Sequence, residues 1–405
     1  MFIKRQIAKQ IQRLSSTFPV IMVTGPRQAG KTTLLRQMDE HRRFVTLDDL
    51  EIRSLAKENP PLFFERFATP LLIDEFQYAP GILPYIKIAV DEKRTRLKKS
   101  HGEFWLTGSQ NFAMMDGVTE SLAGRTAILK LAGLSLREQL DKNTETRPFF
   151  DNPPHAFETE KKPSDLFCVI LRGDKPELTA HPEISASDYY TSYIQTYLER
   201  DVRSQLGVRE LGQFEKLIRL LAIRCGQLLN MSNLAGEIGV KSPTIKSWLT
   251  ILERSFQIII LQPYYKNLNK RQMKTPKIYF LDSGLAAHLL KCENPEQTLN
   301  GPLSGMLFEN WVVSEVIKSY WNNGEEPDLY FWRTRDGDEI DLVLEKGGHL
   351  HAAEIKLSRP ANTRLFQTTE KQIGKTKIAS KKIISLSQRS LPIDSDTELV
   401  SAWDI

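Results

Sequence analysis

The chain has 405 residues, of which 40% are hydrophobic and 26% are charged, and its formal net charge is +5. No run approaches the roughly 18 consecutive apolar residues of a membrane-spanning helix, so this composition excludes that class and predicts a globular protein with no membrane partner. The positive charge permits a polyanionic partner without establishing one. At about 100 to 200 residues per domain, the length favours two to four domains, and we expect three.

The three cysteines, Cys168, Cys225 and Cys292, lie far apart in the sequence. This spacing suggests neither a zinc knuckle nor a disulfide framework. We therefore expect the protein to work in a reducing cytoplasm.

The N-terminal residues combine apolar and basic side chains at helical spacing. Ile3, Ile7, Ile11 and Leu14 fall on a single stripe, whereas Arg5 and the other basic residues lie elsewhere on the turn. Charge interrupts this segment too early for a secretory signal. We expect the amphipathic helix to pack on its own domain, with a position on a membrane surface as the alternative.

A glycine-rich stretch at 25–33 lies between an apolar run at 18–23 and a run with helical spacing at 32–38. Its pattern, G-x-x-x-x-G-K-T at a strand-to-helix turn, predicts a phosphate-binding loop for ATP. Lys31 would reach the outer phosphates and Thr32 would ligate Mg²⁺, while the loop N–H groups face the anion. The residues expected to bind the nucleotide are Gly25, Pro26, Arg27, Gln28, Ala29, Gly30, Lys31, Thr32 and Thr33. The alternative is a glycine turn that binds nothing.

Candidate strands at 44–47, 70–75 and 103–109 alternate with helical stretches. This order predicts an α/β fold with a mostly parallel sheet covered on both faces. The second of these strands ends in Asp74 and Glu75. Asp74 would hold a water on Mg²⁺, and Glu75 would orient and deprotonate the attacking water. Two acids at a strand end are common by themselves, but after a phosphate loop they indicate a hydrolysis pair.

Two further residues are candidates for the ATPase site. Ser109, followed by Gln110 and Asn111, ends a strand and would act as a sensor near the γ-phosphate; a turn-forming role is the alternative. Arg125 follows a helix that ends at a glycine, and its guanidinium can stabilise charge on the transferring phosphoryl group. It would act in the same subunit or in a neighbour's, and the second case implies a homo-oligomer. A solvated arginine at a helix end is the alternative.

Changes of composition suggest the domain boundaries. The ATPase domain should comprise residues 1–140. Scattered prolines and charges mark 141–184 as a linker or irregular connection. Helical spacing dominates 185–300, and mixed strands and helices make up 301–405.

Residues 232–281 have the order helix, turn, helix, strand, basic loop, strand, which is typical of a winged helix-turn-helix. We expect Ser232 to cap the first helix, Gly239 to end it, and Ser242 and Pro243 to begin the second. The second helix should bury its apolar residues, namely Ile245, Trp248, Leu249 and Leu252. Its outward residues should be Thr244, Lys246, Ser247 and Thr250.

The two strands of this segment flank a loop that is rich in cations and has no acid among them. The cations are Lys266, Lys270, Arg271, Lys274 and Lys277. On a wing they would neutralise DNA phosphates and make binding salt-dependent. The alternative is a structural connector or a protein-docking surface.

Four charged residues of the C-terminal segment form a candidate metal site. Glu309 lies on the apolar face of a helix, Asp341 lies in a strand that follows the Asp336-Gly337 turn, and Glu354 and Lys356 alternate onto one face of a strand. Two oxygen ligands for Mg²⁺, Asp341 and Glu354, beside a cation suit phosphodiester hydrolysis. A surface cluster of salt bridges is the alternative.

Basic residues then outnumber acids, with Glu370 the one acid between Lys356 and Lys382. The basic residues are Lys356, Arg359, Arg364, Lys371, Lys375, Lys377, Lys381 and Lys382. This excess favours a polyanion near the candidate metal site.

Taken together, these motifs resemble those of the AAA-type P-loop ATPases of bacteria and archaea that carry a C-terminal restriction-endonuclease-like domain. The resemblance covers nearly the whole chain. It implies that Lys31, Thr32, Asp74 and Glu75 bind ATP and Mg²⁺ and that Arg125 belongs to the ATPase core.

The C-terminal set resembles the D…E-x-K site of restriction-endonuclease-like nucleases. In that resemblance Glu309, Asp341, Glu354 and Lys356 make up the site. The carboxylates would bind Mg²⁺, and Lys356 would polarise the scissile phosphate or the attacking water.

Three functions are compatible with these patterns. The first is an Mg²⁺-dependent ATPase whose nucleotide state controls DNA engagement. The second is an ATP-gated, metal-dependent DNA nuclease. The third is a nucleotide switch that docks a protein partner and never touches nucleic acid.

Overall fold

The computed structural model describes residues 2–97, 100–109, 122–141, 147–153, 157–197, 202, 208–265, 275–334, 337–358, 366 and 378–405. Within these ranges, no helix has the length and apolar character needed to cross a membrane. Some residues named above lie outside the described residues: Gln110, Asn111, Lys266, Lys270, Arg271, Lys274, Asp336, Arg359, Arg364, Glu370, Lys371, Lys375 and Lys377.

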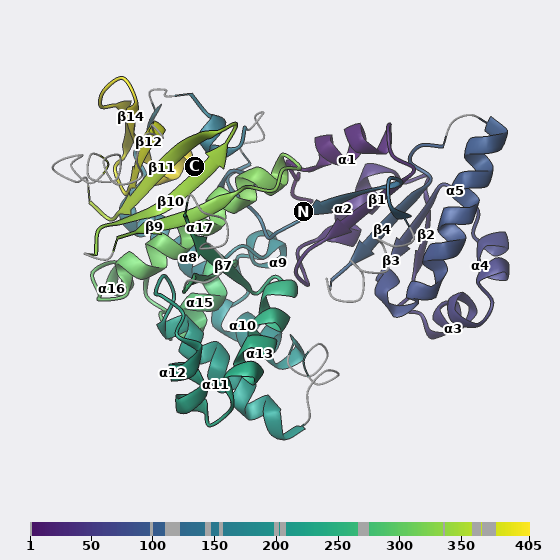
Figure 1. The fold of residues 1–405 in the computed structure, drawn as a ribbon, viewed down its shortest axis with the longest axis horizontal. Coiled ribbons are helices and arrows are strands. Elements are labelled where there is room, and N and C mark those ends of the chain that lie inside the picture. Colours follow the sequence, from purple (N-terminus) through teal and green to yellow (C-terminus); the bar gives the residue numbers. More distant parts are fainter. Residues whose placement is uncertain are drawn as a thin grey trace.

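The N-terminal part is built on a parallel five-stranded sheet with the order β2-β3-β4-β1-β5. The strands are β1 (Val20–Thr24), β2 (Arg43–Thr46), β3 (Leu71–Asp74), β4 (Phe104–Gly108) and β5 (Thr126–Lys130). This sheet and its helices occupy one side of the molecule, coloured purple and blue in Figure 1. The predicted α/β architecture of this part is confirmed.

Helices cover both faces of this sheet: α1 (Ala8–Ser15), α2 (Lys31–Met38), α3 (Leu50–Glu58), α4 (Pro60–Arg66) and α5 (Leu83–Leu97). Alternate residues of β1 point to opposite faces, as the period of a strand requires. Val20 and Met22 pack with α3, α4 and α5, whereas Ile21 and Val23 pack with α1 and α2. The predicted packing of the N-terminal helix on its own domain agrees with the burial of Ile7 and Ile11.

A predominantly helical segment follows. It contains α7 (Leu136–Gln139), the short strand β6 (Phe157–Glu158), α8 (Pro163–Arg172), α9 (Pro176–Ala180), α10 (Ala186–Tyr197), α11 (Val208–Ile223), α12 (Met231–Ile238) and α13 (Ser242–Arg254). Part of the expected linker is therefore regular structure, because the apolar residues of α8 are buried against the helical core.

Helices α12 and α13 have the expected helix-turn-helix order. Gly239 ends α12 in the left-handed conformation, as predicted. The predicted first cap is wrong, because Asn230, not Ser232, accepts the capping bond from the Asn233 N–H. Lys241 precedes α13, with Pro243 in its first turn.

A mixed nine-stranded sheet forms the C-terminal part, with the order β6-β13-β14-β12-β11-β10-β9-β7-β8. Its further strands are β7 (Ile258–Pro263), β8 (Lys277–Phe280), β9 (Leu329–Arg333), β10 (Glu339–Lys346), β11 (His349–Lys356), β12 (Ile378–Ser385), β13 (Arg389–Pro392) and β14 (Thr397–Ser401). The β7–β8 hairpin is antiparallel, but β7 also pairs with β9. The hairpin expected to form a wing thus extends this sheet.

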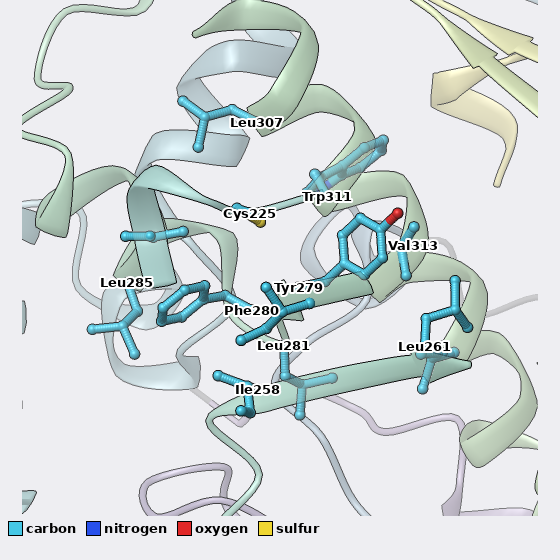
Figure 2. Packing of buried hydrophobic residues seen from close by; sticks show 14 of the residues in the cluster. Cys225, Ile258, Leu261, Tyr279, Phe280, Leu281, Leu285, Leu307, Trp311 and Val313 are labelled. Carbon is cyan, nitrogen blue, oxygen red and sulfur yellow. The ribbon is translucent and has the colours of Figure 1, made fainter. Parts of the chain in front are cut away.

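The remaining helices are α15 (Ser283–Leu289), α16 (Pro295–Leu299) and α17 (Ser304–Asn322). Trp311 and Val313 of α17 pack with Tyr279 and Phe280 of β8 in the large apolar core (Figure 2). The long helix α17 runs from the C-terminal sheet towards the N-terminal domain (Figure 1), where Asn322 Nδ2 donates to Gln6 Oε1 at 3.1 Å. It is one continuous helix that contacts both parts.

Candidate nucleotide site and C-terminal carboxylate cluster

The predicted phosphate loop connects β1 to α2 at the carboxyl edge of the parallel sheet. Gly25 lies so close to the next strand connection that a Cβ there would be 1.9 Å from the Leu131 carbonyl oxygen. Gly30 has φ +85° and immediately precedes α2. Both positions therefore require glycine, one for close approach and the other for its backbone conformation.

Lys31 is folded over this loop. Its Nζ donates to the carbonyl oxygens of Gly25 at 2.9 Å and Pro26 at 2.8 Å. Burial lowers the pKa of Lys31 to about 8, an effect that Glu75 opposes. The ammonium group is thus held at the loop by two carbonyls, which phosphate oxygens can replace.

Thr32 and Asp74 meet at the first turn of α2. The Thr32 hydroxyl donates to Asp74 Oδ1 at 2.5 Å, and the Thr107 hydroxyl donates to the same oxygen. Thr46 Oγ1 is 3.4 Å from Asp74 Oδ2. A hydroxyl beside a carboxylate is a set of hard oxygen atoms that suits Mg²⁺, so these residues fit the predicted metal.

Glu75 follows β3 with a φ of +53°. Ser109, at the end of β4, donates from Oγ to Glu75 Oε2 at 3.1 Å, and Gln77 Nε2 donates to the same oxygen. The structure therefore brings Ser109 and Glu75 together, as it does Thr32 and Asp74. The catalytic roles of these residues stay predictions.

Arg125 lies where the strands begin, at the end of the sheet opposite to the phosphate loop. It precedes β5, and its carbonyl oxygen accepts from the Val20 N–H at the start of β1. The length of β1, about 13 Å at roughly 3.3 Å per residue, separates it from the loop. Its guanidinium pairs with Asp91 of α5 through Nε at 2.8 Å and Nη2 at 2.9 Å. A contact with the nucleotide of the same chain is therefore not supported, and action from a neighbouring subunit stays a prediction.

Other residues at this site were not anticipated from the sequence. Thr107 contacts Asp74, and Gln77 contacts Glu75. Tyr189 of α10 donates to Gln28 Oε1 of the loop at 2.6 Å. Strand alternation in 103–109 could have singled out Thr107, but no sequence signal connects Tyr189 with the loop.

Arg5, which the sequence places off the apolar stripe of the N-terminal segment, lies just before α1. Its side chain is buried and donates to the carbonyl oxygen of Ala29 in the loop at 2.7 Å. A cavity of about 250 Å³ lies beside the same loop. Arg5 lines it together with Gly30, Thr33 and several apolar residues, namely Phe2, Ile3, Leu134 and Pro176.

On α13 the predicted inner and outer faces are largely confirmed. Ile245, Trp248, Leu249 and Leu252 are buried. Lys246 and Ser247 are exposed, whereas Thr244 and Thr250 are half-buried.

The four residues of the C-terminal prediction lie in one region together with a further lysine. Lys277 of β8 was expected on an exposed loop, and that is wrong, because its side chain is only 4% exposed. Its Nζ is 3.1 Å from Glu309 Oε1 and also pairs with Glu339. Tyr279, two residues along β8, donates to Glu309 Oε1 at 2.7 Å. We call Lys277, Glu309, Glu339, Asp341, Glu354 and Lys356 the carboxylate cluster.

Asp341 and Glu354 lie on the paired strands β10 and β11, next to the aligned residues Leu342 and Ala353. Burial, followed by the nearby charge of Glu354, raises the pKa of Asp341 well above its usual range. Asp341 Oδ2 accepts from the Ile355 N–H at 2.8 Å, and Lys356 Nζ is 2.5 Å from Glu354 Oε1. Among the described residues, Glu354 Oε2 is a buried oxygen without a hydrogen-bond donor.

The fit of this cluster to a metal is partial. Across the described ranges, no three His, Cys, Asp or Glu side chains are grouped so that they could hold a metal ion. A metal bound by the carboxylates of Asp341 and Glu354 would therefore need its remaining oxygen ligands from groups other than these side chains. The free oxygen of Glu354 is consistent with that arrangement.

Of the basic residues predicted to attract a polyanion, several of those described are engaged with acids. Lys382 is buried and its Nζ is 2.7 Å from Glu398 Oε2. Lys381 is 3.2 Å from Asp396 Oδ2. Glu398 lies in β14 and Asp396 in the turn before it, so acids from a later segment of the chain neutralise these two lysines.

Comparisons with known proteins find a family that matches the N-terminal part. A family model described as an AAA domain matches residues 17–140. Residues 17–140 are thus similar to AAA domains. This match supports the predicted ATP-binding ATPase.

The other two parts match families without an assigned function. Residues 164–296 match a domain of unknown function, DUF8612, and residues 304–405 match a second one, DUF4143. The restriction-endonuclease-like interpretation of the C-terminal part therefore stays a prediction.

Whole-chain relatives are similar along nearly the entire sequence. The chain is 28% identical over 406 aligned positions to proteins named Uncharacterized protein Rv2008c of Mycobacterium tuberculosis and Uncharacterized protein Mb2031c of Mycobacterium bovis. The alignments cover 99% of this chain and 84% of those proteins. A solved structure of a Walker-type ATPase of Pyrococcus abyssi is 15% identical, with 71% of this chain and 96% of that chain covered and a TM-score of 0.47.

Proposed function

We propose that the chain is a cytoplasmic, Mg²⁺-dependent ATPase whose nucleotide state controls its engagement of DNA. The observation that carries the proposal is the convergence of Lys31, Thr32, Asp74 and Glu75 at one edge of the parallel sheet. The three cysteines are free thiols, which is compatible with a reducing compartment.

The proposed roles follow from chemistry and position. Lys31 and the loop N–H groups bind the phosphates, and Thr32 and Asp74 hold Mg²⁺, which supplies charge neutralisation when bound. Glu75 orients and deprotonates the attacking water. Ser109 and Gln77 hold the Glu75 carboxylate in place through their bonds to Oε2.

The cavity beside the loop is the proposed site of the adenine base. Its apolar lining by Ile3, Leu134 and Pro176 suits a flat heteroaromatic ring, and Gly30 and Thr33 connect it to the phosphate site. Pro176 begins α9, so the base would contact the helical segment as well as the ATPase domain.

Helix α10 supplies a physical link between the nucleotide loop and the helix-turn-helix. Tyr189 bonds to Gln28 of the loop, Tyr193 lies 3.3 Å from Gln257 Oε1, and the hydroxyl of Tyr197 lies 2.8 Å from Ser255 Oγ, directly after α13. The rings of Tyr189, Tyr193 and Tyr197 are stacked, with centroids 6.4 Å apart. This contact path supports coupling between the nucleotide and α13.

Phosphate release by the purified protein tests the ATPase assignment. Lys31→Ala should abolish nucleotide binding, and Glu75→Gln should retain binding but lower turnover by at least about a hundredfold. Lys57→Ala, on the exposed surface of α3, is the matched control and should behave as the wild type. Unchanged turnover in both site variants would contradict these roles.

DNA engagement is tested by fluorescence anisotropy with a labelled duplex, with and without a non-hydrolysable ATP analogue. We expect the analogue to change the affinity by about fivefold or more. Lys246→Ala should weaken binding and reduce its salt dependence. No signal, or a signal insensitive to salt, would favour a switch that docks a protein partner.

The carboxylate cluster favours a second candidate function, a metal-dependent DNA nuclease. The free, buried Glu354 Oε2 beside Asp341 is the observation that supports it, because an orphaned carboxylate oxygen suits a cation. Lys356, paired with Glu354, is positioned to polarise a phosphate.

Cleavage of plasmid and branched DNA tests this second function. Activity should require Mg²⁺ or Mn²⁺ and should be lost in Asp341→Ala, while Asp328→Ala, at an exposed position before β9, should keep it. If neither substrate is cut with or without ATP, or if Asp341→Ala cuts as well as the wild type, the nuclease proposal is wrong.

A further inference from the structure

Arg5 makes an unusual number of contacts for a basic residue near a chain end. Its side chain is 4% exposed. Nη1 donates to the Ala29 carbonyl at 2.7 Å, and Nη2 donates to the carbonyls of Ala132 at 2.8 Å and Gly133 at 3.0 Å. Nε donates to Glu138 Oε1 at 3.1 Å. The planar guanidinium thus ties the phosphate loop to the segment that follows β5.

The contact with Ala29 orients the loop. In a trans peptide the C=O of one residue and the N–H of the next point in opposite directions. Holding the Ala29 carbonyl towards Arg5 therefore turns the Gly30 N–H away from Arg5. The Gly30 amide belongs to the predicted phosphate cradle, so Arg5 fixes the direction of one of its donors.

Glu138 continues the connection. Its Oε1 accepts from Arg5 and from the Gln6 N–H at 2.8 Å, and its Oε2 accepts from the Ser135 N–H at 2.9 Å. The side chain is fully buried. The short helix α7 is consequently held in place by the same carboxylate that holds Arg5.

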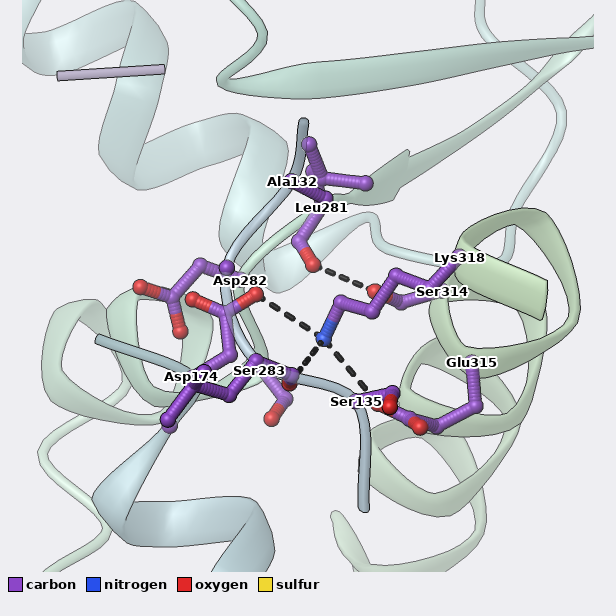
Figure 3. Close-up of polar contacts among 12 residues, drawn as sticks. Ala132, Ser135, Asp174, Leu281, Asp282, Ser283, Ser314, Glu315 and Lys318 are labelled. Carbon is purple, nitrogen blue, oxygen red and sulfur yellow. Dashed lines mark hydrogen bonds and ion pairs between the residues drawn. The ribbon is translucent and has the colours of Figure 1, made fainter. Parts of the chain in front are cut away.

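The next contact reaches α17. The Leu136 N–H donates to Glu315 Oε2 at 2.8 Å, and Glu315 Oε1 is 3.0 Å from Lys318 Nζ. Lys318 also lies 2.9 Å from Asp174 Oδ2, as Figure 3 shows. Asp174 in turn accepts from the Leu134 N–H through its backbone carbonyl at 2.7 Å. All of these charged side chains are buried, where hydrogen bonds to ions are strong and costly to break.

Helix α17 also carries Glu309, whose carboxylate is bound by Lys277 and Tyr279 in the carboxylate cluster. Glu309 and Glu315 lie on one continuous helix, so Leu136 and the carboxylate cluster contact the same element. The contacts from the nucleotide loop through Arg5, Glu138 and Glu315 are buried, and those of Glu309 are partly buried.

We propose that Arg5 is a positioning residue of the phosphate loop and that Glu138 and Glu315 connect it to α17, so that nucleotide binding changes the stability of α17. The proposal rests on nucleotide binding at the loop, as proposed above. By linkage, any coupling along this path acts in both directions.

The first measurement is the affinity for a fluorescent ATP analogue. Arg5→Gln should raise the Kd by about tenfold, and Arg5→Lys, which keeps the charge but lacks the fork, should give an intermediate value. Arg13→Gln is the matched control, because Arg13 lies on the exposed side of the adjoining α1, where it bonds to Gln10. Equal Kd values for Arg5→Gln and Arg13→Gln would overturn the positioning role.

The second measurement is hydrogen exchange of residues 304–322 with and without saturating analogue. In the wild type we expect the analogue to slow exchange in this helix by about fivefold or more, with the effect lost in Arg5→Gln and in Glu315→Gln. Glu315→Gln keeps the shape of the side chain, and its Kd should stay within about threefold of the wild type. It also keeps the test decisive if Arg5→Gln fails to fold.

The outcomes separate this proposal from the function proposed above. Analogue binding without slower exchange in 304–322 overturns the connection and leaves the ATPase proposal intact. Binding with the expected exchange pattern but without hydrolysis or DNA engagement supports the connection and contradicts the function. Absence of any binding by the wild type contradicts both.

Discussion

The nucleotide site and the carboxylate cluster differ in how the chain assembles them. The phosphate loop is one continuous stretch, and Asp74 and Glu75 reach it because β1 and β3, on either side of β4, end at a common edge of the sheet. The carboxylate cluster draws on β8, α17, β10 and β11, and its residues span 277–356. The first site is thus largely encoded by local sequence, whereas the second depends on the packing of distant segments.

Their charges are balanced differently as well. At the candidate nucleotide site the Lys31 ammonium donates to two carbonyl oxygens, and no carboxylate of the described residues forms an ion pair with it. In the cluster Lys277 is bound to Glu309 and Glu339.

The largest expected effect concerns the backbone of the nucleotide site. Gly25→Ala should destabilise the N-terminal domain by roughly 4 kcal/mol and abolish nucleotide binding, because the added Cβ would overlap the Leu131 carbonyl. Gly81→Ala, where a Cβ has open space, is the control. Thermal unfolding and nucleotide titration check both variants. Normal binding by Gly25→Ala would show that the loop still forms when the segment at Leu131 is displaced.

The next largest effect is expected from removing the buried lysine of the carboxylate cluster. Lys277→Met should cost about 3 kcal/mol at neutral pH, because it leaves the neighbouring carboxylates without a buried cation. Lys346→Met, at an ion pair whose lysine is 44% exposed, should cost less than about 1 kcal/mol. Denaturant titration measures the difference.

The pH dependence of the Lys277→Met variant has a definite sign. The carboxyl groups of Asp341 and Glu354 have raised pKa values in the folded state, so the folded protein takes up protons before the unfolded chain does. Lowering the pH towards those values should therefore reduce the stability deficit of the variant. A deficit that grows on acidification would show that Lys277 does not act through these carboxylates.

A smaller effect is expected from the titration of Lys31. Phosphate binding is proposed for its ammonium form, and its pKa of about 8 means that the free protein loses this charge as the pH rises through that value. The Kd for the ATP analogue should consequently be about tenfold higher at pH 9 than at pH 7. Lys31→Arg, which stays charged over this range, should flatten the profile if it still binds.

The smallest effect is expected at Arg125. Arg125→Ala removes a partly exposed ion pair with Asp91 and should change stability by no more than about 1 kcal/mol. The Kd of the variant for the ATP analogue should stay within about twofold of the wild-type value, because Arg125 lies at the end of the sheet away from the phosphate loop. Turnover that falls only at protein concentrations where subunits associate would assign Arg125 to a neighbour's site.

Particular residues show how far the sequence could lead. The strand-to-helix context of Gly25 and Gly30 predicted the loop because the required backbone conformations are local. The inner face of α13 was predictable because helical periodicity is local too. The sequence showed Arg5 and Lys277 only as members of basic groups, since a cation beside other cations carries no sign of the carbonyls and carboxylates that surround it in the fold.

By itself, the sequence determined the parallel α/β sheet of the N-terminal part. It also predicted a phosphate loop with Asp74 and Glu75 beside it and a division into an ATPase domain, a helical segment and a C-terminal part. Only the tertiary structure decided that the β7–β8 hairpin joins the C-terminal sheet, that Arg125 lies away from the loop, and that α17 is bonded to the segment after β5. Short-range motifs are written in consecutive residues, because backbone geometry and periodicity repeat along the chain. Buried ion pairs between distant segments depend on which surfaces pack together, and that is a property of the whole fold.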